Sequence, residues 1–181
     1  MNRLERMTAE AYRASIQGKR NRIQGLKFED IVNEACEHYK TIGLAYIEKT
    51  PEPMRVIGVL NRKLGQFKAV FEKVAQPDYK GTMAGGRTVV FEAKSTETDR
   101  IKQDAVTEDQ RDSLNLHEAM GAQCFVLVSL GMKYYRVPWA KWKTMKEDCG
   151  HKYMNAEDLA PYILGNWPGH LRFLERDPES K

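Results

Sequence analysis

Side chains of the kind that hydrolyse phosphodiesters gather between residues 78 and 94. Asp78 opens one apparent strand, and Glu92 and Lys94 close the next. A strand places residues i and i+2 on the same face, so Glu92 and Lys94 should point the same way. Two clustered carboxylates are hard oxygen ligands of the kind Mg²⁺ prefers, and a nearby ammonium can orient a water or stabilise charge on a phosphate. The set is typical of a metal-dependent phosphodiesterase that acts on DNA.

The segment around these residues favours a hairpin that brings them together. Gly85-Gly86 suits a two-residue turn, since both residues tolerate positive φ. The apolar run 89–91 predicts a strand buried on both faces, and charges at the end of such a strand are costly unless they are paired or bind a metal. The competing interpretation is a chance Glu-x-Lys match that makes ordinary cross-strand ion pairs on an exposed strand.

Length and composition indicate one globular domain. The chain has 181 residues, of which 41% are hydrophobic and 30% charged, enough for a proper core. It contains no run of 18 apolar residues, which excludes a transmembrane helix, and residues 1–6 lack the apolar stretch of a secretory signal. We therefore expect a cytoplasmic protein with no membrane partner.

Positive charge is concentrated in two stretches. Residues 1–27 are rich in Lys and Arg, including Arg20 and Arg22, and residues 133–146 interleave five basic residues with tyrosines and tryptophans. Basic and aromatic side chains together suit phosphate contact and stacking on bases. A solvated face whose aromatic side chains belong to the core fits equally well.

Hydrophobic periodicity predicts helices on both sides of a group of strands. Residues 27–39 have helical spacing and end at Gly43, and residues 107–120 begin with a capping box at Thr107–Gln110. A further short helix is expected at 7–17, and two more near 139–147 and 155–163. Strands are expected at 44–48, 54–60, 124–130 and 132–137, and the hairpin described above spans 78–94. Residues 61–76 read as a charged excursion with little sheet character.

Several stretches, in this order, resemble the RecU family of Holliday junction resolvases, within the restriction-endonuclease-like nucleases and including its phage-type members. They cover roughly residues 20–140 and comprise 25–39, Ile47 to Pro53, Phe71 to Gly81, Val90 to Thr96, Gln110 and 121–128. Two departures stand out. Gln76 occupies the place of a family threonine that contributes to metal binding, and the Lys-x-Pro-x-Pro turn is altered, as Lys49 is followed by Thr50 before Pro51.

The resemblance implies a role for each matching residue. Asp78, Glu92 and the amide of Gln110 would hold Mg²⁺, with Mn²⁺ as a substitute. Lys94 would assist the attacking water or stabilise the transition state. Glu29 would contact the metal through water, although a plain acid on a helix surface is the simpler interpretation. Phosphate contacts would come from basic residues in the N-terminal arm, the excursion and the strand after Asp78: Arg20, Arg22, Arg62, Lys63, Lys68, Lys73 and Lys80.

The fold implied is α/β, with a restriction-endonuclease-like central mixed sheet flanked by helices and a projecting stalk-like excursion. We expect a basic N-terminal arm at 1–24, a nuclease domain at 25–165 with the excursion at about 61–76, and a C-terminal tail at 166–181. The implied activity is symmetric, metal-dependent cleavage of four-way DNA junctions by a homodimer, in recombination and repair. The alternatives are an endonuclease with the same site that cuts duplex ends or flaps, and a protein that binds branched DNA without cutting it.

Overall fold

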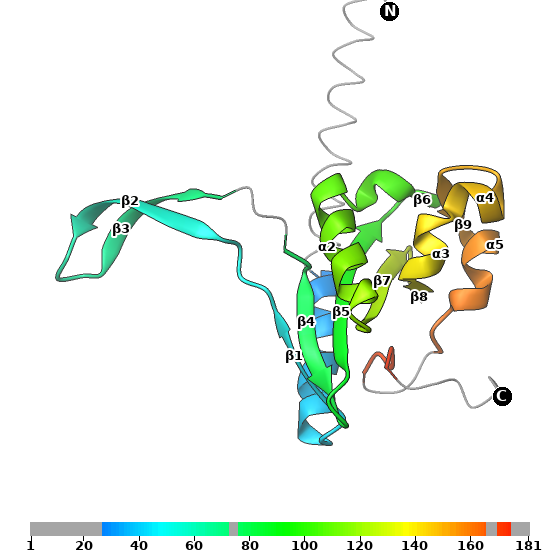
Figure 1. The fold of residues 1–181 in the computed structure, drawn as a ribbon, viewed down its shortest axis with the longest axis horizontal. Coiled ribbons are helices and arrows are strands. Elements are labelled where there is room, and N and C mark those ends of the chain that lie inside the picture. The colour runs from blue at the N-terminus through cyan, green and yellow to red at the C-terminus, as the bar shows by residue number, and fades with distance from the viewer. Residues whose placement is uncertain (1–26, 73–75, 166–169, 175–181) are drawn as a thin grey trace, which may run out of the picture.

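The computed structural model of the chain describes residues 27–72, 76–165 and 170–174. Its centre is a five-stranded sheet in the order β1-β4-β5-β7-β8, built from β1 (Ala45–Lys49), β4 (Tyr79–Met83), β5 (Thr88–Thr96), β7 (Gln123–Leu130) and β8 (Lys133–Pro138) (Figure 1). β5 and β7 are parallel, and the other neighbours are antiparallel. The predicted α/β class with a central mixed sheet flanked by helices is confirmed.

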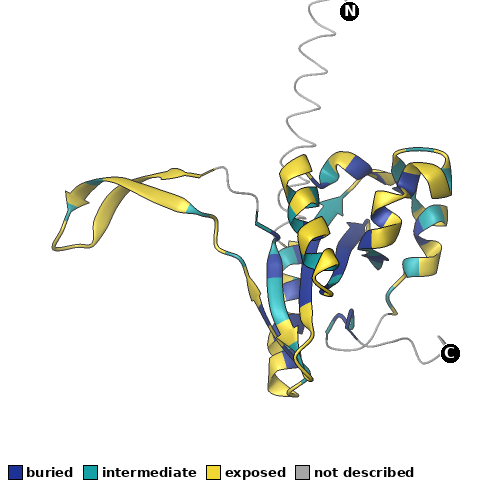
Figure 2. Cartoon of the chain, viewed as in Figure 1, coloured by how far each residue is buried: buried dark blue, intermediate teal, exposed yellow. Residues whose placement is uncertain are grey.

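Both faces of this sheet are covered, because successive residues of the central strands point to opposite sides. Phe91 packs with Val32 and Tyr39 of the helix at residues 27–41, which ends near Gly43 at φ 70° as expected. Val90 faces the other way and packs in a cluster with Leu114 and Trp142. That second face carries α2 (Glu108–Ala119), α3 (Trp139–Lys143), α4 (Met145–Cys149) and α5 (Ala156–Leu159). The buried side chains of β5 are therefore held from both sides (Figure 2).

A second, two-stranded sheet projects from the body as a long hairpin (Figure 1). It consists of β2 (Met54–Asn61) and β3 (Gln66–Phe71), joined at 62–65, and we call it the stalk hairpin. The expectation of little sheet character at 61–76 was wrong for 66–71, and the projection begins earlier, at Met54. Neither face of this hairpin is buried, so its sequence shows no alternation of apolar and polar residues that would mark a core-facing strand. Its turn is closed by Asn61 Oδ1, which accepts hydrogen bonds from the backbone N–H groups of Lys63 and Leu64.

Three local details also differ from the expectations. The β4–β5 hairpin closes through three residues, because Met83 N–H donates to the carbonyl of Arg87, and Gly85 and Gly86 both have positive φ within that loop. A small sheet of β6 (Arg100–Lys102) and β9 (Tyr153–Asn155) was not expected, nor was the short helix η1 (Gln103–Ala105). The short helix η2 (Ala160–Tyr162) lies with α5 within the helix expected near 155–163.

The aromatic side chains of 133–146 belong mainly to the core. Tyr135, Trp139 and Trp142 are buried, and the indole N–H of Trp139 donates to Asn115 Oδ1. They are therefore not free to stack on bases, which decides between the two interpretations of that stretch. Within the described residues, no helix is long and apolar enough to cross a membrane. The expected helix at 7–17 lies outside the described residues.

Candidate active site

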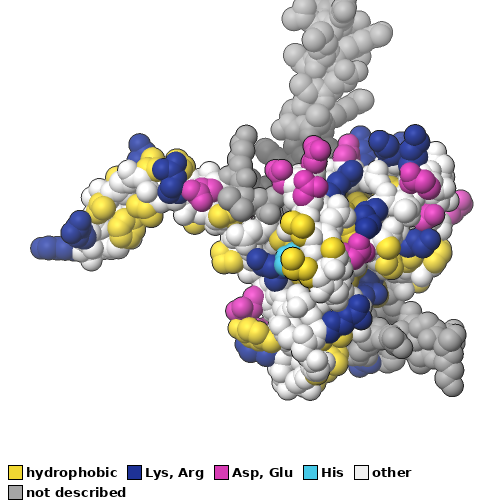
Figure 3. All heavy atoms as spheres, viewed as in Figure 1, with side chains coloured by type: hydrophobic (Ala, Val, Ile, Leu, Met, Phe, Trp, Pro, Cys, Tyr) yellow, Lys and Arg dark blue, Asp and Glu magenta, His cyan; other side chains and the backbone are white. Residues whose placement is uncertain are grey.

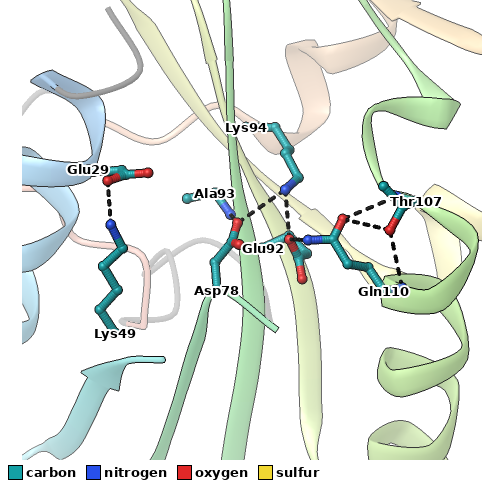
Figure 4. Close-up of polar contacts among 8 residues, drawn as sticks. All are labelled: Glu29, Lys49, Asp78, Glu92, Ala93, Lys94, Thr107 and Gln110. Carbon is teal, nitrogen blue, oxygen red and sulfur yellow. Dashed lines mark hydrogen bonds and ion pairs between the residues drawn. The ribbon is translucent and has the colours of Figure 1, made fainter. Parts of the chain in front are cut away.

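The β4–β5 hairpin brings Asp78 and Glu92 together. Tyr79 pairs with Phe91 across the two strands, so the residue before β4 lies opposite Glu92. One carboxylate oxygen of Asp78, Oδ2, accepts a hydrogen bond from the backbone N–H of Ala93 at 3.0 Å (Figure 4). That bond ties the acid to the neighbouring strand, so its position follows from the sheet itself.

Lys94 lies between the two acids. Its Nζ is 2.7 Å from Glu92 Oε2 and 3.1 Å from Asp78 Oδ2, as expected for residues that share one face of β5. Desolvation alone lowers the pKa of Lys94, but the carboxylates of Asp78 and Glu92 outweigh it and raise that pKa above its ordinary value. Lys94 is therefore a protonated ammonium, held by both acids.

Glu92 is the most deeply buried charge of the set, with no exposed surface. Burial raises its pKa to about 8, against the opposing effect of Lys94, and Asp78 adds to the rise. Its Oε2 accepts from Lys94 and from Gln110, whereas its Oε1 is buried and makes no hydrogen bond with any described residue. A buried carboxylate oxygen of this kind is a candidate ligand for a cation.

Gln110 reaches this site from the first turn of α2. Its Nε2 donates to Glu92 Oε2 at 2.7 Å, and its Oε1 accepts from the backbone N–H of Thr107 at 3.1 Å. The Thr107 hydroxyl in turn accepts from the backbone N–H of Gln110, which completes a reciprocal capping box. The capping motif predicted from the sequence therefore also orients a carboxylate of the site, a role that sequence reasoning did not give to Thr107.

Glu29 lies beside this set, on the side of Asp78 away from Gln110 (Figure 4). Its Oε2 pairs with Lys49 Nζ at 2.5 Å, and both side chains are partly exposed. Within the described part of the chain, Glu29 makes no ion pair with Lys94. From the sequence, Glu29 was expected near the metal, and its ion pair with Lys49 was not predicted. The two residues are 20 positions apart, and no local sequence motif indicates that they pair.

The candidate DNA contacts fall into two groups. Arg62 and Lys63 lie in the turn at the tip of the stalk hairpin, and Lys68 lies further along β3, opposite Gly58. All three are exposed, and Figure 3 shows basic side chains both at the tip and along the projection. Lys80 lies on β4 near the site, where its Nζ donates to Gln76 Oε1 at 3.1 Å. Gln76, in the place of the family threonine, is thus engaged by a lysine. Arg20, Arg22 and Lys73 lie outside the described residues.

A hollow of about 310 Å³ opens beside the site. Its walls come from the base of the stalk hairpin, including Pro53 and Phe71, and from Asp78, Thr107 and Gln110. The described residues hold no group of three or more Asp, Glu, His or Cys side chains that could cage a metal ion. Two carboxylates, an amide and a lysine beside an open hollow form a site that leaves room for a substrate oxygen and water around a cation, as metal-assisted hydrolysis requires.

Comparison with known proteins assigns this arrangement to a family. The sequence profile described as Recombination protein U (RecU) matches residues 23–172. The chain is similar to the Holliday junction resolvase RecU of Bacillus pumilus, with 29% identity over 163 residues that cover 86% of this chain and 76% of the relative. It is 28% identical to the RecU of Bacillus subtilis over 157 residues, which cover 80% of this chain and 75% of the relative.

A solved structure, the Holliday junction resolvase Hjc of Archaeoglobus fulgidus, aligns with a TM-score of 0.47 at 12% identity and covers 75% of this chain and 93% of that one. The profile match spans most of the chain, including all of the residues that form the candidate site. The chain belongs to the RecU family.

Proposed function

We propose that this protein is a structure-specific endodeoxyribonuclease that resolves four-way DNA junctions. The observation that carries the proposal is the Asp78–Glu92–Lys94 set, assembled at the edge of a buried strand in a member of the RecU family. Clustered acids repel phosphate, so a protein that only bound branched DNA would gain nothing from them. The set therefore favours cleavage over binding alone.

The cation proposed here is Mg²⁺, with Mn²⁺ as a substitute. The residues fit it, because Asp78 and Glu92 supply hard oxygen atoms and Glu92 Oε1 is a buried acceptor without a hydrogen-bond partner among the described residues. When bound, such an ion would polarise the phosphate and lower the pKa of a coordinated water. Gln110 would support the ion by orienting Glu92; direct ligation, as the family resemblance implies, would require its amide to turn its oxygen away from Thr107.

The protein's own contribution to catalysis would come mainly from Lys94. Its ammonium lies on the same face as both acids and carries a raised pKa, so it stays charged at neutral pH. From that position it can donate a hydrogen bond to a phosphate oxygen as negative charge develops, or hold the attacking water in line. Asp78, fixed by the backbone of Ala93, keeps Lys94 in place during this step.

The stalk hairpin supports a homodimer as the active form. Its described residues expose many apolar side chains, spread over both faces: Met54, Val56, Ile57, Val59, Leu60, Leu64, Phe67, Val70 and Phe71. Such a surface marks an interaction site, and a four-way junction has approximate two-fold symmetry that a two-fold dimer can match. We propose that the dimer acts in the cytoplasm, with Arg62 and Lys63 at the hairpin tip directed at the junction.

The deciding experiment is incubation of the purified protein with a labelled four-way junction in Mg²⁺ and, separately, in EDTA. We expect paired, symmetric nicks in Mg²⁺ only. Linear duplex and flap substrates run in parallel test the alternative endonuclease activities. Tight junction binding with no nicks in Mg²⁺ or Mn²⁺ would overturn the proposal in favour of a protein that binds branched DNA without cutting it.

A further inference from the structure

A second hollow, of about 630 Å³, lies at the end of β5 beyond Lys94. Its walls come entirely from the stretch between Lys94 and Ala105, which includes the end of β5, the loop at 97–99, β6 and η1. This is twice the volume of the hollow beside Asp78 and falls in the range of sites that bind small organic ligands, about 300–1,000 Å³.

This hollow continues the active site along the same face of the sheet. Lys94 contacts both catalytic acids and also lines the hollow. Because side chains alternate along a strand, Thr96 shares the face of Glu92 and Lys94. The smaller hollow adjoins Asp78 and Gln110. Both hollows therefore border the catalytic set, and a strand cut at Asp78 and Glu92 can extend into the one that Lys94 lines.

The walls offer the chemistry that a nucleotide needs. The hydroxyls of Thr96 and Thr98 are 2.8 Å apart, and Thr98 Oγ1 donates to the carbonyl of Arg100 at 2.7 Å, which fixes the loop. Lys102 is exposed, and the half-buried Ala105, with the edge of Ile101, supplies a small apolar part of the lining. Hydroxyl and ammonium groups suit a phosphate and sugar, and apolar surface suits a base.

The charge of the lining also favours a nucleic-acid strand. Three cations, Lys94, Arg100 and Lys102, face two acids, Asp99 and Asp104. Asp99 is paired with Arg100 at 3.4 Å, and the Arg100 guanidinium is 4.9 Å from the centre of the Tyr153 ring. The charge of Lys94 is balanced by the catalytic acids, so Lys102 and Asp104 are the charged groups of the lining most open to a ligand. Lys102 can contact a phosphate, and the Asp104 carboxylate can accept a hydrogen bond from a base amino group.

We propose that this hollow holds the nucleotide of the cut strand that adjoins the scissile phosphate, and that it gives cleavage a base preference at that position. The inference rests on the proposed function and deepens it, because it assigns the substrate contacts next to the catalytic set. A junction-specific nuclease recognises branch shape globally, and this hollow adds a local choice of which phosphate is cut.

The test fills the hollow with a large side chain. Thr98→Trp should lower junction cleavage at least about tenfold and shift the mapped nick positions, because a nucleotide can no longer enter. Mn²⁺ binding, measured by calorimetry without DNA, and overall junction affinity should stay close to wild type. The matched control is Thr88→Trp, an exposed threonine at the opposite end of the same strand, which should leave the rate and the nick positions unchanged.

A second variant keeps the test decisive if Thr98→Trp does not fold. Lys102→Ala should lower the slope of log junction affinity against log salt concentration by about 1, the contribution of one phosphate contact. Lys40→Ala, an exposed lysine on the helix that packs on the opposite face, should not reduce it. Wild-type nick positions in Thr98→Trp, or wild-type salt slopes in Lys102→Ala, would overturn the inference. Absence of cleavage by the wild-type protein would instead overturn the proposed function.

Discussion

Glu92, in the central sheet, carries an ionisable group with no exposed surface, whereas Leu60 and Phe71 of the stalk hairpin are each 70% exposed. The two regions depart from the usual distribution of side chains in opposite directions. One buries acids where the sheet is driest, and the other leaves apolar side chains on a thin, two-stranded projection (Figure 2). Both arrangements lower the stability of the isolated chain: the sheet buries a carboxylate, and the hairpin leaves apolar side chains in water. In each region this indicates that a binding partner supplies the missing contacts.

The partners differ in kind. Burial of a carboxylate costs several kcal/mol unless its charge is fully balanced, and Glu92 shares the one ammonium of Lys94 with Asp78. The site therefore calls for a cation in addition to Lys94. A two-stranded hairpin is marginal in water by itself, and its exposed edges invite pairing, so the stalk hairpin calls for a second protein chain or a nucleic acid. We therefore assign cleavage to the sheet and junction recognition to the hairpin, and mutations should abolish either one while leaving the other intact.

The largest effect should come from the acids. Asp78→Asn should lower junction cleavage by at least about 100-fold, in the range that follows removal of a principal electrostatic group from an active site. Junction binding in EDTA should be nearly unchanged, because the acid contacts no phosphate without a cation. The control is Asp30→Asn, an exposed acid on the helix at 27–41. Wild-type cleavage by Asp78→Asn would place the active site elsewhere.

The opposite change removes the hairpin and spares the site. Replacement of residues 55–70 by a short Gly/Ser link should preserve the fold, because no residue of β2 or β3 is buried in either core. The shortened protein should be a monomer by analytical ultracentrifugation and lose its preference for junctions over linear duplex. The replacement removes four basic side chains, of which Arg55 is paired with Glu72, so the salt slope of junction binding should fall by about 3 per protomer. A shortened protein that still dimerises and selects junctions would make this hairpin a surface excursion without function.

The sequence was most informative where local rules decide the structure. The glycine pair Gly85-Gly86 and the two-residue period of β5 were enough to bring Asp78 beside Glu92, although the exact register follows from a three-residue loop that was not expected. The capping box fixed the start of α2. A strand at 54–60 and a stalk-like projection were expected, but β3 was missed because both faces of the stalk hairpin are exposed and charges such as Lys68 interrupt any alternation. The pairing of β6 with β9 joins segments about fifty residues apart, and no local pattern encodes that contact.

A smaller effect tests how the site is held. Thr107 and Asn155 each begin a helix with a reciprocal capping box, but only Thr107 supports a residue that touches Glu92. Thr107→Val and Asn155→Ala should each cost about 1 kcal/mol of stability. Only Thr107→Val should also weaken Mn²⁺ binding, by about tenfold, because an unanchored Gln110 no longer orients Glu92. Thr107→Ser should restore the affinity. Equal losses of Mn²⁺ affinity in both variants would reduce Thr107 to an ordinary cap.

The smallest effect concerns the stability cost of the buried acid. The pKa of Glu92 rises from 4.5 to about 8 on folding, chiefly through burial. Between these values the folded protein keeps a proton that the unfolded chain has lost, so without metal its free energy of unfolding should fall as pH rises from about 4.5 to 8.

Glu92→Gln should flatten this dependence in EDTA and raise the melting temperature at pH 8 by several degrees, at about 2–4 °C per kcal/mol. Glu37→Gln, which changes an exposed glutamate, should leave the pH profile as it is. Mg²⁺ should stabilise the wild type and not Glu92→Gln, because a ligand that binds only the folded state raises its stability. Parallel pH profiles for wild type and Glu92→Gln would mean that the sheet tolerates this carboxylate without cost. In that case the stalk hairpin would be the only region of the comparison where stability is given up for function.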